Sequence, residues 1–167
     1  NKKFNEAEKL SLSIILEFPR NQFAWKILGA VLRETGRINE SLFAAQKSVE
    51  LELKNSDVHD NLGTTLRKLG RLEEAEASYR KAISLRPDFA EAQYNLSLTL
   101  QQLGKLEQAE ESYRKAILLK PDFEAAHLNL GATLQQLGKL EQAEESYRKA
   151  ISLRPDFASH LNLGVTL

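Results

Sequence analysis

The stretch LQQLGKLEQAEESYRKAI occupies residues 100–117 and recurs without a change at residues 134–151, 34 residues later. All four prolines also fall on multiples of this interval, at Pro19, Pro87, Pro121 and Pro155. Proline fixes its own backbone angle, so its recurrence at a constant interval indicates that one backbone path is repeated. We therefore expect an array of small repeated units rather than one irregular core.

The glycines support the same division of the chain. Seven of the eight fall at two positions of the repeat, and Gly164 misses the first of these positions by one residue. The interval predicts whole units at residues 22–55, 56–89, 90–123 and 124–157. Residues 1–21 are then expected to be the second half of a preceding unit, and residues 158–167 the start of a further, truncated unit.

Each unit is predicted to form two helices joined by a tight turn. In the unit 90–123, leucines recur every three or four residues up to Gly104, which is expected to end the first helix in the left-handed backbone conformation. A second apolar run follows and stops before Pro121. Asp122 and the equivalent Asp88 come directly after these prolines, where a side-chain oxygen is expected to cap the next helix.

The composition argues against several classes of protein. The 167-residue chain carries 23 basic and 23 acidic side chains, and this zero net charge is untypical of a nucleic-acid binder. No apolar run approaches the roughly 18 residues that a membrane span needs, and no N-terminal stretch is typical of a secretion signal. We therefore expect no nucleic-acid or membrane partner, and a cytoplasmic location.

The sequence offers no recognisable catalytic or metal site. It has no cysteine, no glycine-rich phosphate loop and neither the HExxH nor the GxSxG motif. The histidines are His59, His127 and His160. The first two lie two units apart, about 20 Å at ordinary helix spacing, whereas zinc ligands must each reach within about 2.1 Å of the metal. We expect packing or surface roles for these histidines, no cofactor and no enzymatic activity.

The units share a pattern of small, aromatic and proline residues. It comprises Trp25 with Leu28 and Gly29, Ala75 with Tyr79 and Pro87, Ala109 with Tyr113 and Pro121, and Ala143 with Tyr147 and Pro155. Together these residues resemble the tetratricopeptide repeat family over essentially the whole chain, although Ser97 replaces one glycine and Leu53 one proline. The resemblance implies an all-α, right-handed solenoid of tandem helix-turn-helix units, similar to regular bacterial arrays, that acts as a binding scaffold.

A series of asparagines is the sharpest feature of the expected binding surface. Asn61, Asn95 and Asn129 share one position of the first helix, and Asn162 takes it again once the one-residue slip is allowed. Helical geometry puts this position opposite the packing face, on the side that stacked units turn into a concave groove. A carboxamide can pair with both polar groups of a peptide bond. First helices about 10 Å apart would meet every third residue of an extended peptide.

The asparagine series leaves two interpretations open. It resembles the asparagine ladder in the repeat arm of O-linked N-acetylglucosamine transferase, which implies contact with a bound peptide. Alternatively, each asparagine was copied by duplication and forms hydrogen bonds within the stack.

The remaining predicted groove residues are Lys26, Arg33, Asp60, Arg67 and Tyr94. The charges gather toward the N-terminal half of the groove, which favours polar peptide segments, acidic ones included. Lys26 and Asn61 also match the carboxylate clamp of chaperone-binding tetratricopeptide domains. Three other clamp positions do not match, so we do not expect capture of a C-terminal carboxylate.

These observations predict a protein–protein interaction scaffold that binds an extended peptide of unknown identity in its concave groove. One alternative is self-assembly, because the near-identical units and the apolar edge left at the C-terminal end could stack one molecule on another. A second alternative is an accessory arm of a larger enzyme, since regular arrays of this kind resemble those preceding glycosyltransferase or sulfotransferase domains.

Overall fold

The computed structural model describes residues 2–153, and every regular element in that range is an α-helix. The helices are α1 (Lys2–Glu17), α2 (Gln22–Glu34), α3 (Ile38–Leu51), α4 (Ser56–Lys68), α5 (Leu72–Leu85), α6 (Ala90–Gln102), α7 (Leu106–Leu119), α8 (Glu124–Gln136) and α9 (Leu140–Leu153). The predicted all-α fold is confirmed. Asn162, His160 and the predicted truncated unit lie outside the described residues.

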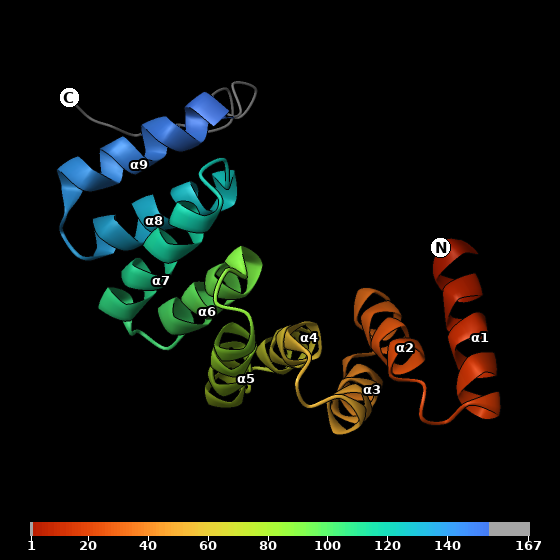
Figure 1. The fold of residues 1–167 in the computed structure, drawn as a ribbon. Coiled ribbons are helices and arrows are strands. Elements are labelled where there is room, and N and C mark those ends of the chain that lie inside the picture. The colour runs from red at the N-terminus through yellow and green to blue at the C-terminus, as the bar shows by residue number, and fades with distance from the viewer. Residues whose placement is uncertain (1, 154–167) are drawn as a thin grey trace.

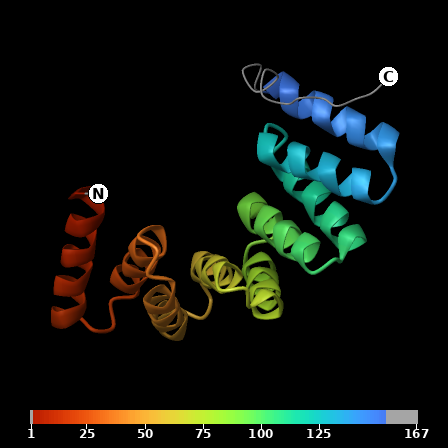
Figure 2. The ribbon, with the colours of Figure 1, turned by 180° about the vertical axis from the view of Figure 1, so that it is seen from behind.

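The helices pair into hairpins that stack along an open arc (Figures 1 and 2). The pairs are α2 with α3, α4 with α5, α6 with α7 and α8 with α9, and each second helix also packs on the first helix of the next pair. First helices additionally contact one another, because α2 and α4, and likewise α4 and α6, have Cα atoms within 8 Å. Figure 1 places α2 and α4 toward the inside of the arc, with α3 and α5 outside. The molecule is therefore a helical-repeat solenoid.

Glycines end the first helix of each hairpin as the sequence predicts. Gly36, Gly70, Gly104 and Gly138 have φ angles of 81°, 74°, 72° and 74°, in the left-handed region that favours glycine. At the second of these turns the backbone N–H of Arg71 donates to the carbonyl of Leu66 at 3.0 Å, which satisfies a carbonyl that the helix end would leave unpaired.

The expected aspartate caps are wrong. The N-cap residues of α6 and α8 are Phe89 and Phe123, one residue after the predicted aspartates Asp88 and Asp122, and neither helix has a side-chain cap. The Phe123 ring instead packs 4.7 Å from the ring of Tyr94, measured between centroids. At the start of α8, ring packing across the unit junction thus takes the place of a side-chain cap.

The equivalent cap position is polar in the first two hairpins. The side chain of Asn21 accepts from the backbone N–H of Ala24 at 3.0 Å, and that of Asn55 accepts from the N–H of Asp57 at 2.9 Å. These two helix starts are therefore capped in the ordinary way.

In the second and fourth hairpins, a glycine of the first helix lies directly against an aromatic ring of the second helix. Tyr79 on α5 is fully buried, and a Cβ added at Gly63 on α4 would lie 2.8 Å from its ring. A Cβ at Gly131 would meet the equivalent ring of its own hairpin at 2.6 Å. In the first hairpin Ala45 stands where the others have tyrosine, and a Cβ at Gly29 would find ordinary contacts of 3.5 Å or more.

The aromatic and histidine side chains at the fourth position of the first helix have one structural role. Each donates a ring N–H to the backbone carbonyl six residues earlier: Trp25 to Pro19 at 2.8 Å, His59 to Leu53 at 2.8 Å and His127 to Pro121 at 3.0 Å. Because a carbonyl only accepts, Nε2 of each histidine carries the proton. The prediction of packing histidines holds for His59 and His127, and residues 2–153 contain no cluster suited to a metal ion.

Within residues 2–153, no helix has both the length and the apolar character needed to cross a membrane.

We predict that Gly63→Ala and Gly29→Ala have opposite effects on stability. The alanine at position 63 would press against the buried Tyr79 ring, and such overpacking costs about 1–3 kcal/mol. At position 29 the same change meets no clash, and the better helix propensity of alanine should stabilise the chain by up to about 1 kcal/mol. Urea unfolding followed by circular dichroism measures both. Equal unfolding midpoints for the two variants would show that the helix–ring contact is looser than described.

Candidate functional site

The inner face is the surface of the first helices α2, α4, α6 and α8 on which the predicted groove residues lie. Its described members are all half-buried: Lys26, Arg33, Asp60, Asn61, Arg67, Tyr94, Asn95 and Asn129. Side chains on this face join each first helix to the next, as the following contacts show. The inner face is therefore a continuous polar strip along the inside of the arc.

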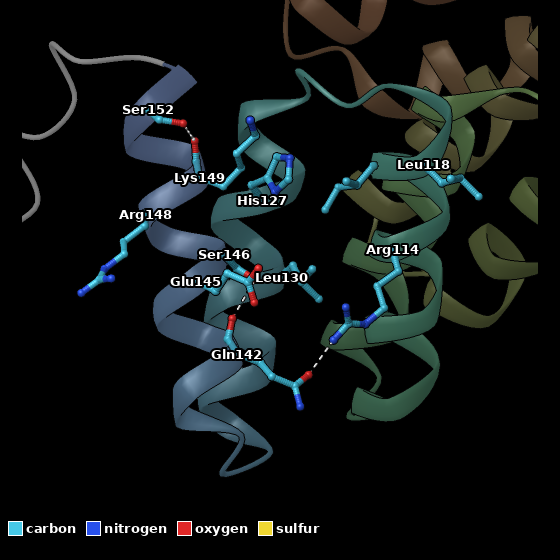
Figure 3. Close-up of a pocket in the computed structure, with 11 residues that line it drawn as sticks. Arg114, Leu118, His127, Leu130, Gln142, Glu145, Ser146, Arg148, Lys149 and Ser152 are labelled. Atoms are coloured by element: carbon cyan, nitrogen blue, oxygen red, sulfur yellow. Dashed lines mark hydrogen bonds between the residues drawn. The ribbon is translucent and has the colours of Figure 1, made fainter.

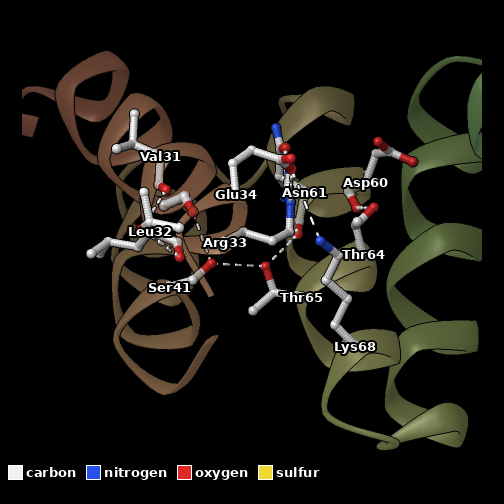
Figure 4. Close-up of polar contacts among 12 residues, drawn as sticks. Val31, Leu32, Arg33, Glu34, Ser41, Asp60, Asn61, Thr64, Thr65 and Lys68 are labelled. Carbon is white, nitrogen blue, oxygen red and sulfur yellow. Dashed lines mark hydrogen bonds and ion pairs between the residues drawn. The ribbon is translucent and has the colours of Figure 1, made fainter. Parts of the chain in front are cut away.

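The three described asparagines each contact the preceding first helix. The Arg33 guanidinium donates to Oδ1 of Asn61 at 3.2 Å, and Nδ2 of Asn61 donates to the Asp57 carbonyl at 2.9 Å (Figure 4). Nδ2 of Asn95 donates to Oδ1 of Asp60 at 3.0 Å. Across the next junction, Nδ2 of Asn129 donates to the Tyr94 hydroxyl at 2.9 Å.

These bonds correspond to the second interpretation of the asparagine series, in which the side chains form hydrogen bonds within the stack. They use only part of each carboxamide, which has two N–H donors and one carbonyl acceptor. Among residues 2–153 nothing donates to the side-chain carbonyl of Asn95 or Asn129, and each keeps one free amide N–H. The asparagines therefore hold the units together and still carry hydrogen-bonding capacity.

Most of the cations at the N-terminal end of the inner face have an acidic side chain as a partner. Lys26 Nζ lies 4.0 Å from Oδ2 of Asp57. Glu34 lies 3.6 Å from Arg33 and 4.0 Å from Lys68 (Figure 4). The sequence shows these charges but not their pairing. The mixed charge expected at this end of the inner face is thus arranged as ion pairs between neighbouring first helices and within α2.

Asp60 is a half-buried carboxylate in the middle of this set. Burial raises its pKa above the ordinary value, against the opposing effects of the hydrogen bond from Asn95 and the positive charge of Arg33. The negative charges of Asp57 and Glu91 raise the pKa further. The ionised form of Asp60 is thus less favourable in the folded chain than in water.

Tyr94 is a fixed aromatic surface on the inner face. Its ring packs on Phe123, and its centroid lies 6.0 Å from that of Tyr113. Burial raises the pKa of Tyr94, so the hydroxyl stays protonated at neutral pH. While it accepts from Asn129, its own O–H proton is not donated to any residue in the described part of the chain.

The outer surface carries hollows that the sequence analysis missed. One lies between α7 and α9 over a floor provided by α8, has a volume of about 760 Å³ and is shown in Figure 3. There the Arg114 guanidinium donates to Gln142 at 2.7 Å, with His127 and Leu130 of α8 lying between the outer helices. A hollow of about 240 Å³ lies one unit earlier, between α5 and α7.

A third hollow of about 470 Å³ occupies the equivalent place between α1 and α3. Its lining is more apolar, with Leu12, Trp25 and Phe43 where the last hollow has Arg114, His127 and Glu145. Aligning the outer positions of the second helices at the 34-residue interval would have revealed this change in character. The outer surface is therefore repeated in shape and varied in chemistry.

We predict that Asp60→Asn gains stability relative to the wild type as pH rises. Because the folded chain raises the pKa of Asp60, folded protein binds more protons than unfolded protein between the two pKa values, and stability falls across that range. The asparagine keeps an acceptor for Asn95 and does not ionise. Urea unfolding at pH values from about 4, the ordinary aspartate pKa, up to neutrality measures the difference. A constant or shrinking advantage of the variant would contradict the buried, disfavoured carboxylate.

Comparisons with known proteins agree with this architecture. Family models described as "TPR repeat" match residues 63–104 and 98–138, and one described as "Tetratricopeptide repeat" matches residues 124–157. The matched residues together make up more than half of the chain. None of the curated proteins compared with the chain matches it.

Solved structures share the fold at low sequence identity. A crystal structure of MamA is 24% identical with a TM-score of 0.84, covering 93% of this chain and 91% of its own. MamA from Desulfovibrio magneticus RS-1 is 18% identical with a TM-score of 0.77, covering 93% and 97%. YrrB is 23% identical with a TM-score of 0.78, covering 94% and 81%.

Repeat arrays of this kind present extended concave surfaces to their partners. The family models, the stacked hairpins and the polar inner face agree. The chain belongs to the tetratricopeptide repeat family and is a protein-interaction scaffold.

Proposed function

We propose that the inner face binds an extended peptide segment of a partner protein. The observation that carries the proposal is the orientation of Asn95 and Asn129, whose amides are held by Asp60 and Tyr94 while their carbonyls stay free of any donor within residues 2–153. A polar group already held in one orientation loses little conformational entropy when it binds a ligand. The contacts within the stack therefore prepare these groups for a ligand.

The spacing of the first helices suits an extended chain. Packed helices lie about 8–10 Å apart, and an extended peptide rises about 3.3 Å per residue. One carboxamide would then meet every third peptide group. At about 0.5–1.5 kcal/mol net per hydrogen bond, a few such contacts give weak to moderate affinity.

One similar structure supports a peptide as the class of ligand. YrrB is described as a TPR protein with an unusual peptide-binding site. At 23% identity it shares the fold with this chain, and the proposal itself rests on the inner-face contacts described above.

Self-association is a second candidate, favoured by the exposed leucines of α1. Leu12 is 43% exposed and Leu16, one turn further along the same face, is 85% exposed, and such an exposed apolar strip often marks a contact surface. The apolar C-terminal edge predicted from the sequence lies outside the described residues.

We predict that the variant Asn95→Ala/Asn129→Ala binds peptides at least about tenfold more weakly than the wild type, since about 1.4 kcal/mol is lost with two bonding groups. The measurement is titration of short random peptides selected on the wild-type chain. The matched control is Gln108→Ala/Gln142→Ala, which removes two amides from the outer surface, where they accept from Arg80 and Arg114. Thermal melts check folding. Equal binding by a folded inner-face variant would refute the peptide site.

We further predict that Leu16→Lys weakens self-association, because it places a charge in the exposed apolar strip of α1. The variant should show a smaller increase in average molecular mass with protein concentration than the wild type. Light scattering over a concentration series measures this. Leu118→Lys is the control, since Leu118 is 81% exposed at the equivalent position of α7. A wild-type chain that is monomeric at every concentration would rule out self-association.

A further inference from the structure

We infer that Arg67 is the point at which the inner face receives an acidic side chain, aspartate or glutamate, of the bound peptide. The inference rests on the proposed peptide-binding function and specifies the chemistry of that ligand. It is carried by the absence of an acidic partner for Arg67 within residues 2–153 and by the groups that surround its guanidinium.

The other cations of the first helices within residues 2–153, and Arg86 in the turn after α5, are paired with carboxylates. Lys26 is paired with Asp57, Arg33 and Lys68 with Glu34, and Arg86 donates to Asp57 at 2.8 Å. Arg67 forms no ion pair with any described residue. A peptide carboxylate could therefore pair with Arg67 without displacing an internal partner.

The register of the repeat explains why Arg67 is left unpaired. Arg33, the equivalent residue of α2, donates to Asn61, which lies 28 residues further on. The corresponding partner of Arg67 would be Asn95, but the Asn95 amide is turned to Asp60. Arg33 also has Glu34 beside it in the chain, whereas Arg67 is followed by Lys68.

The surroundings of Arg67 favour a charge-assisted hydrogen bond. Arg67 is half-buried, and its Nε–H is shielded from solvent without a hydrogen-bond partner. Its guanidinium is close enough to Tyr79 to lower the pKa of that hydroxyl, against the larger effect of burial. It is also close enough to Tyr94 to lower the pKa of that hydroxyl, against the larger effect of burial. Reduced hydration strengthens a guanidinium–carboxylate bond, and the planar guanidinium suits two carboxylate oxygens at once.

Tyr94 supplies a second donor beside Arg67. Its hydroxyl accepts from Asn129 and donates to no residue in the described part of the chain, so its proton is available to a ligand oxygen. A carboxylate, which only accepts, matches this pair of donors, whereas an ammonium or guanidinium group of a peptide does not.

The position that Arg67 takes in its unit is occupied by a neutral glutamine in the next two units. Gln101 accepts from Tyr113 at 3.0 Å and Gln135 accepts from Tyr147 at 3.1 Å. Glutamine is thus compatible with the fold at this position, which makes Arg67→Gln a suitable variant. It removes the charge and places there a side chain that two neighbouring units already accommodate.

The test uses short random peptides selected on the wild-type chain, followed by titration of each peptide and of versions in which one acidic residue becomes its amide. We expect the selected peptides to share an acidic residue whose conversion weakens binding about tenfold, and Arg67→Gln to cause a similar loss. On Arg67→Gln the peptide conversion should have little further effect, because the two changes remove the same contact. Thermal melts confirm that the variants fold.

The control is Arg148→Gln, which removes an equal charge from α9 on the outer surface, where Arg148 is paired with Glu144. Binding should be unchanged. An equal loss with this control would mean general charge attraction and would overturn the Arg67 assignment. Peptides that bind without any acidic preference, or equally well to Arg67→Gln, would overturn the Arg67 assignment and leave the proposed peptide-binding function standing. Failure to select any peptide would overturn the peptide-binding proposal with it.

Discussion

The whole arrangement depends on how closely the two helices of each hairpin approach one another. At Gly63 the absence of a side chain lets the Tyr79 ring lie directly against the backbone of α4, and the ring is completely buried there. The same contact recurs at Gly131. Because close packing fixes the distance within a hairpin, it also fixes how the next first helix rests on the pair. Repetition of one local geometry then produces the arc seen in Figure 1.

The proposed peptide site consists of side chains that also have a structural role. Asn95 and Asn129 secure the junctions between first helices through one amide N–H each, and their remaining polar groups face no described donor. A hydrogen bond across a half-buried junction contributes only about 0.5–1.5 kcal/mol, so these residues add modest stability. The binding role proposed for them follows from these contacts, since a carboxamide that is already oriented binds with a smaller loss of entropy. A site of this kind needs little rearrangement when a ligand arrives.

Local backbone signals could be read from the sequence, whereas side-chain partners could not. The 34-residue interval predicted first helices starting near residues 22, 56, 90 and 124, and helices start at all four places. The left-handed glycines were predictable for the same reason, because the signal lies within a few residues of the turn. Asn95 forms its hydrogen bond with Asp60, 35 residues away, and not with Arg67. Phe123 packs on Tyr94, and Asp122 does not cap α8. Such choices depend on three-dimensional neighbours that no local pattern specifies.

A repeated binding surface has a problem of register that only an irregular residue can solve. If every unit presented the same groups, an extended peptide could slide by about three residues and meet an equivalent set of contacts, since helices lie about 8–10 Å apart and the peptide rises about 3.3 Å per residue. Positions 101 and 135 carry glutamine, and Arg33 has Glu34 as an ionic partner, so Arg67 breaks this equivalence. In the proposed site, a cation without an acidic partner among residues 2–153 would make one alignment of an acidic peptide more favourable than its neighbours. Specificity in such an array then comes from the departure from the repeat, while affinity comes from the repeat itself.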